Sequence, residues 1–156
     1  MSVGEHCSRD VIVAYGDEPV RAAAHLMRQH HVGDVIVVED QGERRFPVGI
    51  VTDRDLVVEV LESGIDPDRV VLADLVTGPL LPLREHEGLA DSLGRMRARG
   101  VRRAPVVDDD GALVGVLSMD DVVELIAEEM TDLSALVARE RARERDTRSG
   151  PPGGPR

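Results

Sequence analysis

The sequence has almost no aromatic residues: one Phe, one Tyr and no Trp among 156 residues. This composition excludes a protein that binds single-stranded nucleic acid by stacking bases on aromatic rings. The one cysteine, Cys7, has no second cysteine with which to form an internal disulfide, which agrees with a reducing compartment. No run of about 18 apolar residues could span a bilayer, and the N-terminus lacks the apolar segment of a signal peptide. We therefore expect a cytoplasmic protein with no membrane partner.

Lysine is absent as well, since all 19 basic residues are arginine. The net charge of −11 is unevenly distributed: residues 139–156 carry +3 and residues 1–138 carry −14. An acidic body of this kind repels the phosphates of nucleic acids. We therefore expect no nucleic-acid partner.

The chain contains one unit twice. Residues 20–38 match residues 89–107 at an offset of 69, and residues 49–56 match residues 115–122 at an offset of 66. The three-residue change falls between two apolar runs, where we expect a hairpin loop to absorb it. We divide the chain into repeats at 8–64 and 76–130, a connector at 65–75, a C-terminal helix at 131–146 and a disordered tail at 147–156.

Each repeat is expected to read strand, helix, strand, strand, helix, which gives an α+β, sandwich-like fold with a pseudo-twofold axis between the repeats. Helices with buried apolar stripes are expected at 20–31, through Val20, Ala24 and Met27, and at 89–100. Strands are expected at 35–40, 48–51, 104–109 and 113–117. The last helix of the first repeat should start at Thr52, end at Gly64 and bury Leu56, Val57, Val60 and Leu61.

Two hydroxyl and carboxylate pairs stand where an apolar strand meets a helix: Thr52 with Asp55, and Ser118 with Asp121. One interpretation is a capping box at each helix start. The other is a ligand site, because a helix N-terminus attracts an anion and a carboxylate can accept two hydrogen bonds from a ribose diol. The two are compatible if the hydroxyl caps the helix while the carboxylate points outward.

The duplication is accompanied by the motifs VGIVTDRDL, VGVLSMDDV and GVRRAPVVDDDG. With these features, the chain resembles a tandem pair of CBS (cystathionine-β-synthase) domains, also called a Bateman module. TDRDLVVEVLESGIDP is similar to small stand-alone bacterial CBS-pair proteins of the hypoxic response protein type. The resemblance implies an adenosyl ligand, AMP, ADP, ATP or S-adenosylmethionine, bound between the repeats as a regulatory ligand, with no cofactor required.

The resemblance also implies roles for individual residues. Asp55 and Asp121 would hold ribose diols, and Thr52 and Ser118 would reach phosphate. Arg102 and Arg103 would bind phosphate, whereas Asp34 at the matching place in the first repeat would repel it, unless Arg54 compensates for Asp34 or pairs with it. The remaining expected ligand contacts are Val11 and Val35 for one adenine, Leu80 and Ala104 for the other, and Ser8 and Thr77 beside the ligand.

We expect one good site, around Asp121, Ser118, Arg102 and Arg103, in a regulatory module that is not an enzyme and whose regulated partner is unknown. A homodimer is expected through an apolar stripe at Val122, Ile126, Met130, Leu133 and Val137. The alternative is a ligand-free dimeric scaffold with a vestigial cleft. No histidine pair has metal-site spacing, and the sequence Asp108 to Gly111 fits a hairpin turn better than a calcium loop.

Overall fold

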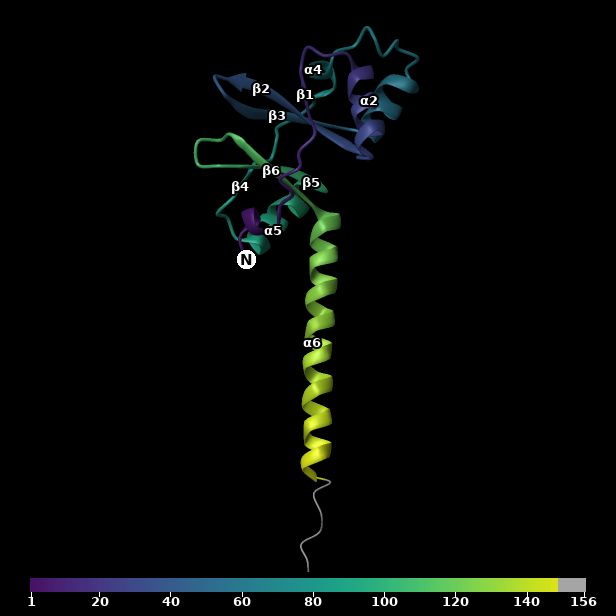
Figure 1. Ribbon diagram of the computed structural model, residues 1–156. Helices are drawn as coiled ribbons and strands as arrows, with labels where there is room; N and C mark the ends of the chain where they lie inside the picture. The colour runs from purple at the N-terminus through teal and green to yellow at the C-terminus, as the bar shows by residue number, and fades with distance from the viewer. Residues whose placement is uncertain (149–156) are drawn as a thin grey trace, which may run out of the picture. The chain divides into compact units, whose positions relative to one another are not determined.

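The computed structural model describes residues 1–148, with side chains described through residue 145, and divides into two compact units, Met1–Met119 and the chain from Asp120 onward. The first unit contains, in order, α1 (Val3–His6), β1 (Val13–Tyr15), α2 (Val20–His30), β2 (Asp34–Gln41), β3 (Arg44–Thr52), α3 (Asp53–Asp55), the π-helix η1 (Leu56–Leu61), α4 (Leu72–Leu75), β4 (Leu83–Arg84), α5 (Leu89–Arg99), β5 (Arg103–Val107) and β6 (Leu113–Ser118) (Figure 1). The helix α6 (Met119–Arg148) follows. The expected α+β fold with two repeat units is confirmed.

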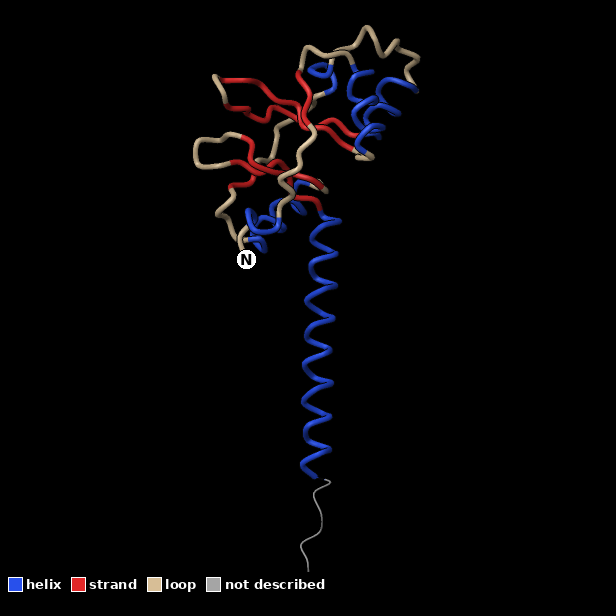
Figure 2. The backbone as a smooth tube through the Cα atoms, viewed as in Figure 1, coloured by secondary structure: helices blue, strands red, loops and turns tan. Residues whose placement is uncertain are grey.

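Each repeat forms one three-stranded sheet, in the order β1-β2-β3 or β4-β5-β6 (Figure 2). The first two strands of each sheet are parallel and the last two are antiparallel. A helix connects the parallel strands, as such a crossover requires. The central strands β2 and β5 are buried on both faces, from Val35 to Val38 and from Ala104 to Val107. This is why they read as unbroken apolar runs in the sequence.

The buried faces of the first repeat's helices differ from the prediction. In α2, Ala23 is buried beside Val20 and Met27, whereas Ala24 is exposed. In η1 only Val60 is buried.

Val57 and Leu61 of η1, which we expected to be buried, are 55% and 72% exposed. The reason is the π-helical hydrogen bonding, in which the Glu62 N–H donates to the Val57 carbonyl at 3.0 Å. A helix bonded five residues apart has more than 3.6 residues per turn, so positions chosen at α-helical spacing do not share a face.

Contrary to the prediction, the three extra residues of the first hairpin do not lie in its loop: two residues, 42 and 43, join β2 to β3, whereas five, 108–112, join β5 to β6. In the first repeat β2 and β3 have eight and nine residues, against five and six in β5 and β6. The turn between β2 and β3 is short, and Gly42 adopts a positive φ of 66° there. The three additional residues therefore lengthen the first hairpin.

The opening segments of the repeats are exchanged. The segment with α1 precedes the first repeat but bonds to the second: the Val3 N–H donates to the Glu87 carbonyl at 2.9 Å, and the Gly4 N–H to the Glu85 carbonyl at 2.8 Å. Ser8 then pairs with Val116 at the edge of β6, through two hydrogen bonds of 2.9 Å. The first strand of the first repeat, β1, begins only at Val13, five residues after the expected start of that repeat at residue 8.

The segment with α4 makes the reciprocal exchange. It lies in the expected connector at 65–75, yet the Leu72 N–H donates to the Glu18 carbonyl and the Ala73 N–H to the Gly16 carbonyl, both at 2.9 Å. Each exchanged segment crosses a strand of the other repeat at a glycine. A Cβ at Gly49 would lie 2.5 Å from the Cγ atoms of Val76, and a Cβ at Gly115 would lie 2.7 Å from the Cys7 sulfur.

The second unit is one helix. The sequence predicts a C-terminal helix at 131–146, and in the structure these residues are part of α6, which runs without interruption from Met119 to Arg148. Of the tail expected at 147–156, residues 147 and 148 belong to α6, and residues 149–156 lie outside the described part of the chain. Every side chain from Ile126 to Arg145 is exposed. Within residues 1–148, no helix is both long and apolar enough to cross a membrane.

Candidate functional site between the repeats

The pair of Thr52 and Asp55 forms a complete capping box. The Thr52 hydroxyl accepts a hydrogen bond from the Asp55 N–H at 3.2 Å, and the Asp55 carboxylate accepts one from the Thr52 N–H at 2.8 Å. The expectation that Asp55 points outward was therefore wrong, because its carboxylate turns back to a backbone N–H that the helix itself cannot bond.

The last helix of each repeat begins with an equivalent hydrogen bond from its first residue to the backbone before the central strand. The Asp53 N–H donates to the Gly33 carbonyl at 2.9 Å, and the Met119 N–H donates to the Arg102 carbonyl at 2.8 Å. Ser118 ends β6 and is buried, and its Cα partner in β5 is Arg103. Asp121 lies in the first turn of α6, in the second unit, and is exposed.

Asp34 and Arg103 form an ion pair between the repeats, with Arg103 Nε 2.9 Å from Asp34 Oδ1. Their side chains are 12% and 32% exposed. The two residues occupy the same position in the two repeats, at the offset of 69. Equivalent positions can meet in this way only near the twofold axis that relates the repeats. The sequence contained this signal, an acid and a base at one repeat position, but we did not anticipate the pair.

Pairing with Asp34 was one of two roles considered for Arg54, and in the structure Asp34 contacts Arg103. Arg54 is exposed on α3 and its backbone N–H donates to Asp53 Oδ1 at 2.8 Å. A Cβ at Gly33 would lie 3.3 Å from Asp53 Oδ2, which is a tight contact, and 3.7 Å from an Arg103 nitrogen, which is an ordinary one. Arg102 is exposed, whereas Arg103 is half-buried.

The exchanged segments regroup the remaining predicted residues. Ser8 joins the second repeat, where its partner Val116 lies two positions along β6 from Ser118. Thr77 follows Val76, which lies against Gly49 in β3, so Thr77 belongs with the first repeat.

The side chains expected against adenine differ in exposure. Val35 and Ala104 are completely buried, because they lie in the central strands, and so offer no surface to a ligand. Val11 and Leu80 are half-buried.

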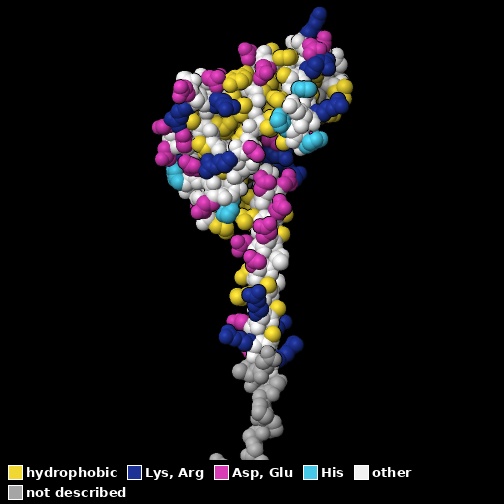
Figure 3. Space-filling model, viewed as in Figure 1, with side chains coloured by type: hydrophobic (Ala, Val, Ile, Leu, Met, Phe, Trp, Pro, Cys, Tyr) yellow, Lys and Arg dark blue, Asp and Glu magenta, His cyan; other side chains and the backbone are white. Residues whose placement is uncertain are grey.

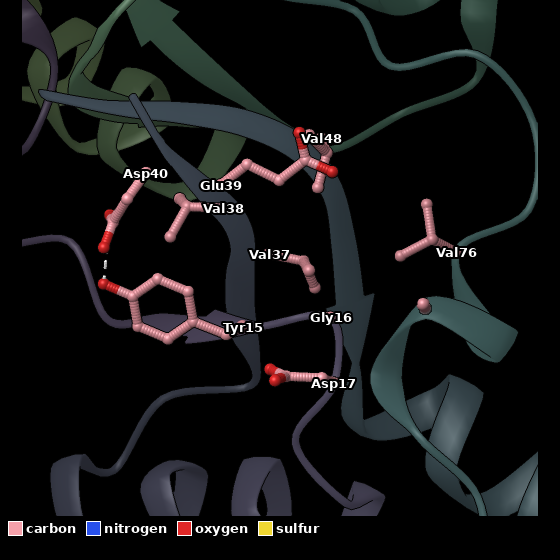
Figure 4. Close-up of a pocket in the computed structure, with 10 residues that line it drawn as sticks. Tyr15, Gly16, Asp17, Val37, Val38, Glu39, Asp40, Val48 and Val76 are labelled. Atoms are coloured by element: carbon pink, nitrogen blue, oxygen red, sulfur yellow. Dashed lines mark hydrogen bonds between the residues drawn. The ribbon is translucent and has the colours of Figure 1, made fainter. Parts of the chain in front are cut away.

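A cavity of about 660 Å³ lies elsewhere, at the far ends of β1 and β2 (Figure 4). Val37, Val48 and Val76 line it together with the carboxylates of Asp17 and Glu39. The Tyr15 hydroxyl donates to Asp40 at 3.2 Å. Desolvation and this hydrogen bond raise the pKa of Tyr15. None of the predicted ligand contacts lines this cavity.

Cys7 is half-buried, and burial raises the pKa of its thiol, which makes the thiolate less accessible as a metal ligand. Within the described residues, no three His, Cys, Asp or Glu side chains are grouped as a metal site.

Curated relatives resemble the chain over most of its length. An uncharacterized protein of Methanopyrus kandleri is 37% identical over 125 residues, which is 80% of this chain and 62% of that protein. Hypoxic response protein 1 of Mycobacterium tuberculosis is 29% identical over 126 residues, 81% of this chain and 78% of that protein.

Solved structures share the fold. The crystal structure of Hypoxic Response Protein I with two coordinated zinc ions matches with a TM-score of 0.68 at 27% identity, covering 80% of this chain and 98% of that one. A CBS domain protein of Pyrobaculum aerophilum complexed with AMP matches with a TM-score of 0.69 at 21% identity, covering 78% of this chain and 89% of that one. The CBS domain family matches residues 3–62 and 72–128. The chain therefore belongs to the CBS domain family and carries two CBS domains in tandem.

Proposed function

We propose that the chain is a regulatory module that binds an adenine nucleotide between its repeats and transmits the occupancy of this site to a partner. The observation that carries the proposal is the position of Arg103, a half-buried guanidinium at the twofold axis, beside the end of β6 and the start of the last helix. The AMP complex of the Pyrobaculum aerophilum relative supports an adenosyl ligand for this fold. The role is binding rather than catalysis.

Arg103 gives the module a way to respond to its ligand. Its guanidinium now contacts Asp34 of the other repeat. A nucleotide phosphate, like a carboxylate, can accept two hydrogen bonds from the planar guanidinium group and carries more charge, so it competes with Asp34 for Arg103. Binding would exchange a contact between the repeats for a contact with the ligand. A ligand that favours one arrangement of the repeats shifts the population toward it.

The site beside Ser118 is the better candidate of the two. In the first repeat the Asp55 carboxylate already accepts the Thr52 N–H. In the second repeat Ser8 and Ser118 supply hydroxyls on the same strand edge, and Arg102 and Arg103 supply positive charge. We therefore propose one nucleotide per chain, with Asp121 as the ribose contact.

Calorimetric titration with AMP, ADP, ATP and S-adenosylmethionine tests the proposal. We expect one site per chain and a preference for the phosphorylated ligands, because a sulfonium gains nothing from the arginines. Asp121→Ala should weaken binding by about tenfold or more, since a hydrogen bond to a charged group contributes roughly 1.5–3 kcal/mol. Asp91→Ala is the matched control, because Asp91 is also an exposed acid in the first turn of a helix. Equal weakening by both variants, or no heat with any ligand, would contradict the proposal.

A second candidate is a ligand-free dimeric scaffold. The ion pair itself favours it, because Arg103 already has a carboxylate partner between the repeats. In that case Asp34 and Arg103 only hold the repeats together. Substitution of either residue would then destabilise the fold, and adding nucleotides would not change the stability of the wild type or of the variant.

We also propose that the chain forms a homodimer. Large apolar side chains are exposed on η1 and along α6, and such surfaces mark contacts with other proteins. Of the stripe expected to mediate this contact, Val122 is buried and unavailable, whereas its other members are exposed. A sedimentation mass of 16.9 kDa at all micromolar concentrations would refute the dimer.

A further inference from the structure

Five of the large exposed apolar side chains of α6 recur at a coiled-coil spacing, and Leu136 is exposed beside them. Val123, Ile126, Met130, Leu133 and Val137 follow one another at alternating steps of three and four residues. This period of 3.5 residues is the pattern of two helices that wind around each other. The five side chains are between 45% and 62% exposed. A helix with such an exposed apolar stripe gains stability by burying it against another helix.

The charges along α6 are divided between its two halves. Residues 119–138 contain six carboxylates and no basic residue, whereas residues 139–148 contain five arginines and three carboxylates. Figure 3 shows acidic side chains gathered along the first part of the helix and arginines along the second. Two such helices in parallel would bring acidic half against acidic half. In the antiparallel orientation, the acidic half of each helix lies along the basic half of the other.

We propose that α6 pairs with α6 of a second copy of this chain as an antiparallel coiled coil. The apolar layers then join Met130 of one copy to Leu133 of the other, and Ile126 to Val137. Val123 lies opposite Glu140 of the second copy. The proposal specifies where the two copies meet and does not depend on nucleotide binding.

Cysteine cross-linking of the full chain tests both the contact and its orientation, in a Cys7→Ser background. Val123→Cys with Glu140→Cys should give a covalent dimer on mild air oxidation, whereas each single variant should not. The two positions are about 25 Å apart along one helix, so they cannot form a disulfide within one chain. A dimer from Val123→Cys alone would mean a parallel pair, and no dimer from the double variant would mean that α6 has another partner or none. Both results would overturn the proposal.

A charge placed in the apolar stripe distinguishes loss of the contact between the two helices from a general effect on α6 itself. Leu133→Glu in the double-cysteine chain should abolish the cross-link, because it buries a carboxylate in a central layer. Ala135→Glu adds the same charge two residues away on the opposite, exposed side of the helix, and should leave the yield unchanged. Equal yields from the two variants would show that the stripe is not the interface.

Discussion

The crossing of the exchanged segments over glycines predicts an unusual cost for adding one methyl group. In Gly49→Ala the new Cβ would lie 2.5 Å from both Cγ atoms of Val76, well inside van der Waals contact. Gly49 is not among the glycines with positive φ, so alanine suits its backbone and the cost is steric. Overpacking costs about 1–3 kcal/mol, and the lower entropy of the unfolded chain offsets about 0.4–1 kcal/mol of it. We expect a net loss of about 1–2 kcal/mol in the free energy of unfolding.

Two further variants make this prediction specific. Gly94→Ala is the matched control, because Gly94 is exposed within α5 and its Cβ would meet nothing within 4 Å. It should stabilise the chain by about 0.5–1 kcal/mol. Val76→Ala removes the two clashing Cγ atoms, so in the double variant it should recover most of the Gly49→Ala loss. Urea denaturation measures the free energy of unfolding of the wild type, of the three single variants and of the double variant, which is compared with Val76→Ala alone. If Gly49→Ala were as stable as Gly94→Ala, the segment with Val76 would not cross β3 as described.

Three other predictions concern the ends of the strands. Thr52→Ala removes the hydroxyl of the capping box and should cost about 0.5–2 kcal/mol in thermal or urea unfolding; an unchanged midpoint would contradict the cap. Asp34→Asn should tighten ATP binding in the proposed site by roughly fivefold, because it removes a competing carboxylate from Arg103; weaker binding would mean that Asp34 positions the arginine for the ligand. Against the opposing effect of desolvation, the Ala112 N–H and the Arg44 guanidinium lower the pKa of Asp108. The stability that this carboxylate contributes is therefore present above its unfolded pKa and is lost as the pH falls through the lower folded pKa. Arg44→Gln should reduce this loss when the free energy of unfolding is measured at decreasing pH.

Much of the fold could be predicted from the sequence because its signals are local and repeated. Apolar runs followed by turn residues gave the hairpins, and the Thr52-x-x-Asp55 pattern gave a cap that the structure confirms. The π-helix η1 could not be predicted, because no residue type marks a change from i→i+4 to i→i+5 bonding. The exposure of Val57 and Leu61 follows from it. The cytoplasmic location and the domain limits stay predictions.

The candidate site was harder to predict because it depends on which repeat each segment joins. Periodicity does not reveal that the segment with Ser8 bonds to β6 and that α4 bonds to the first repeat. Gly49 and Gly115 occupy matching positions of the two repeats in the sequence, but only the structure shows that a segment of the chain crosses close to each of them. Asp34 and Arg103 were read as separate local charges, and only the twofold relation brings them together.

The most direct test of the account is thermal unfolding of the wild type and of Arg103→Gln, each with AMP, ADP, ATP and S-adenosylmethionine. A ligand at 100 times its Kd adds about 2.7 kcal/mol, which for a chain of this length raises Tm by roughly 5–10 °C. We predict such a rise for at least one nucleotide with the wild type and a much smaller rise with Arg103→Gln. Unchanged Tm values with every ligand would contradict nucleotide binding between the repeats and would favour the scaffold.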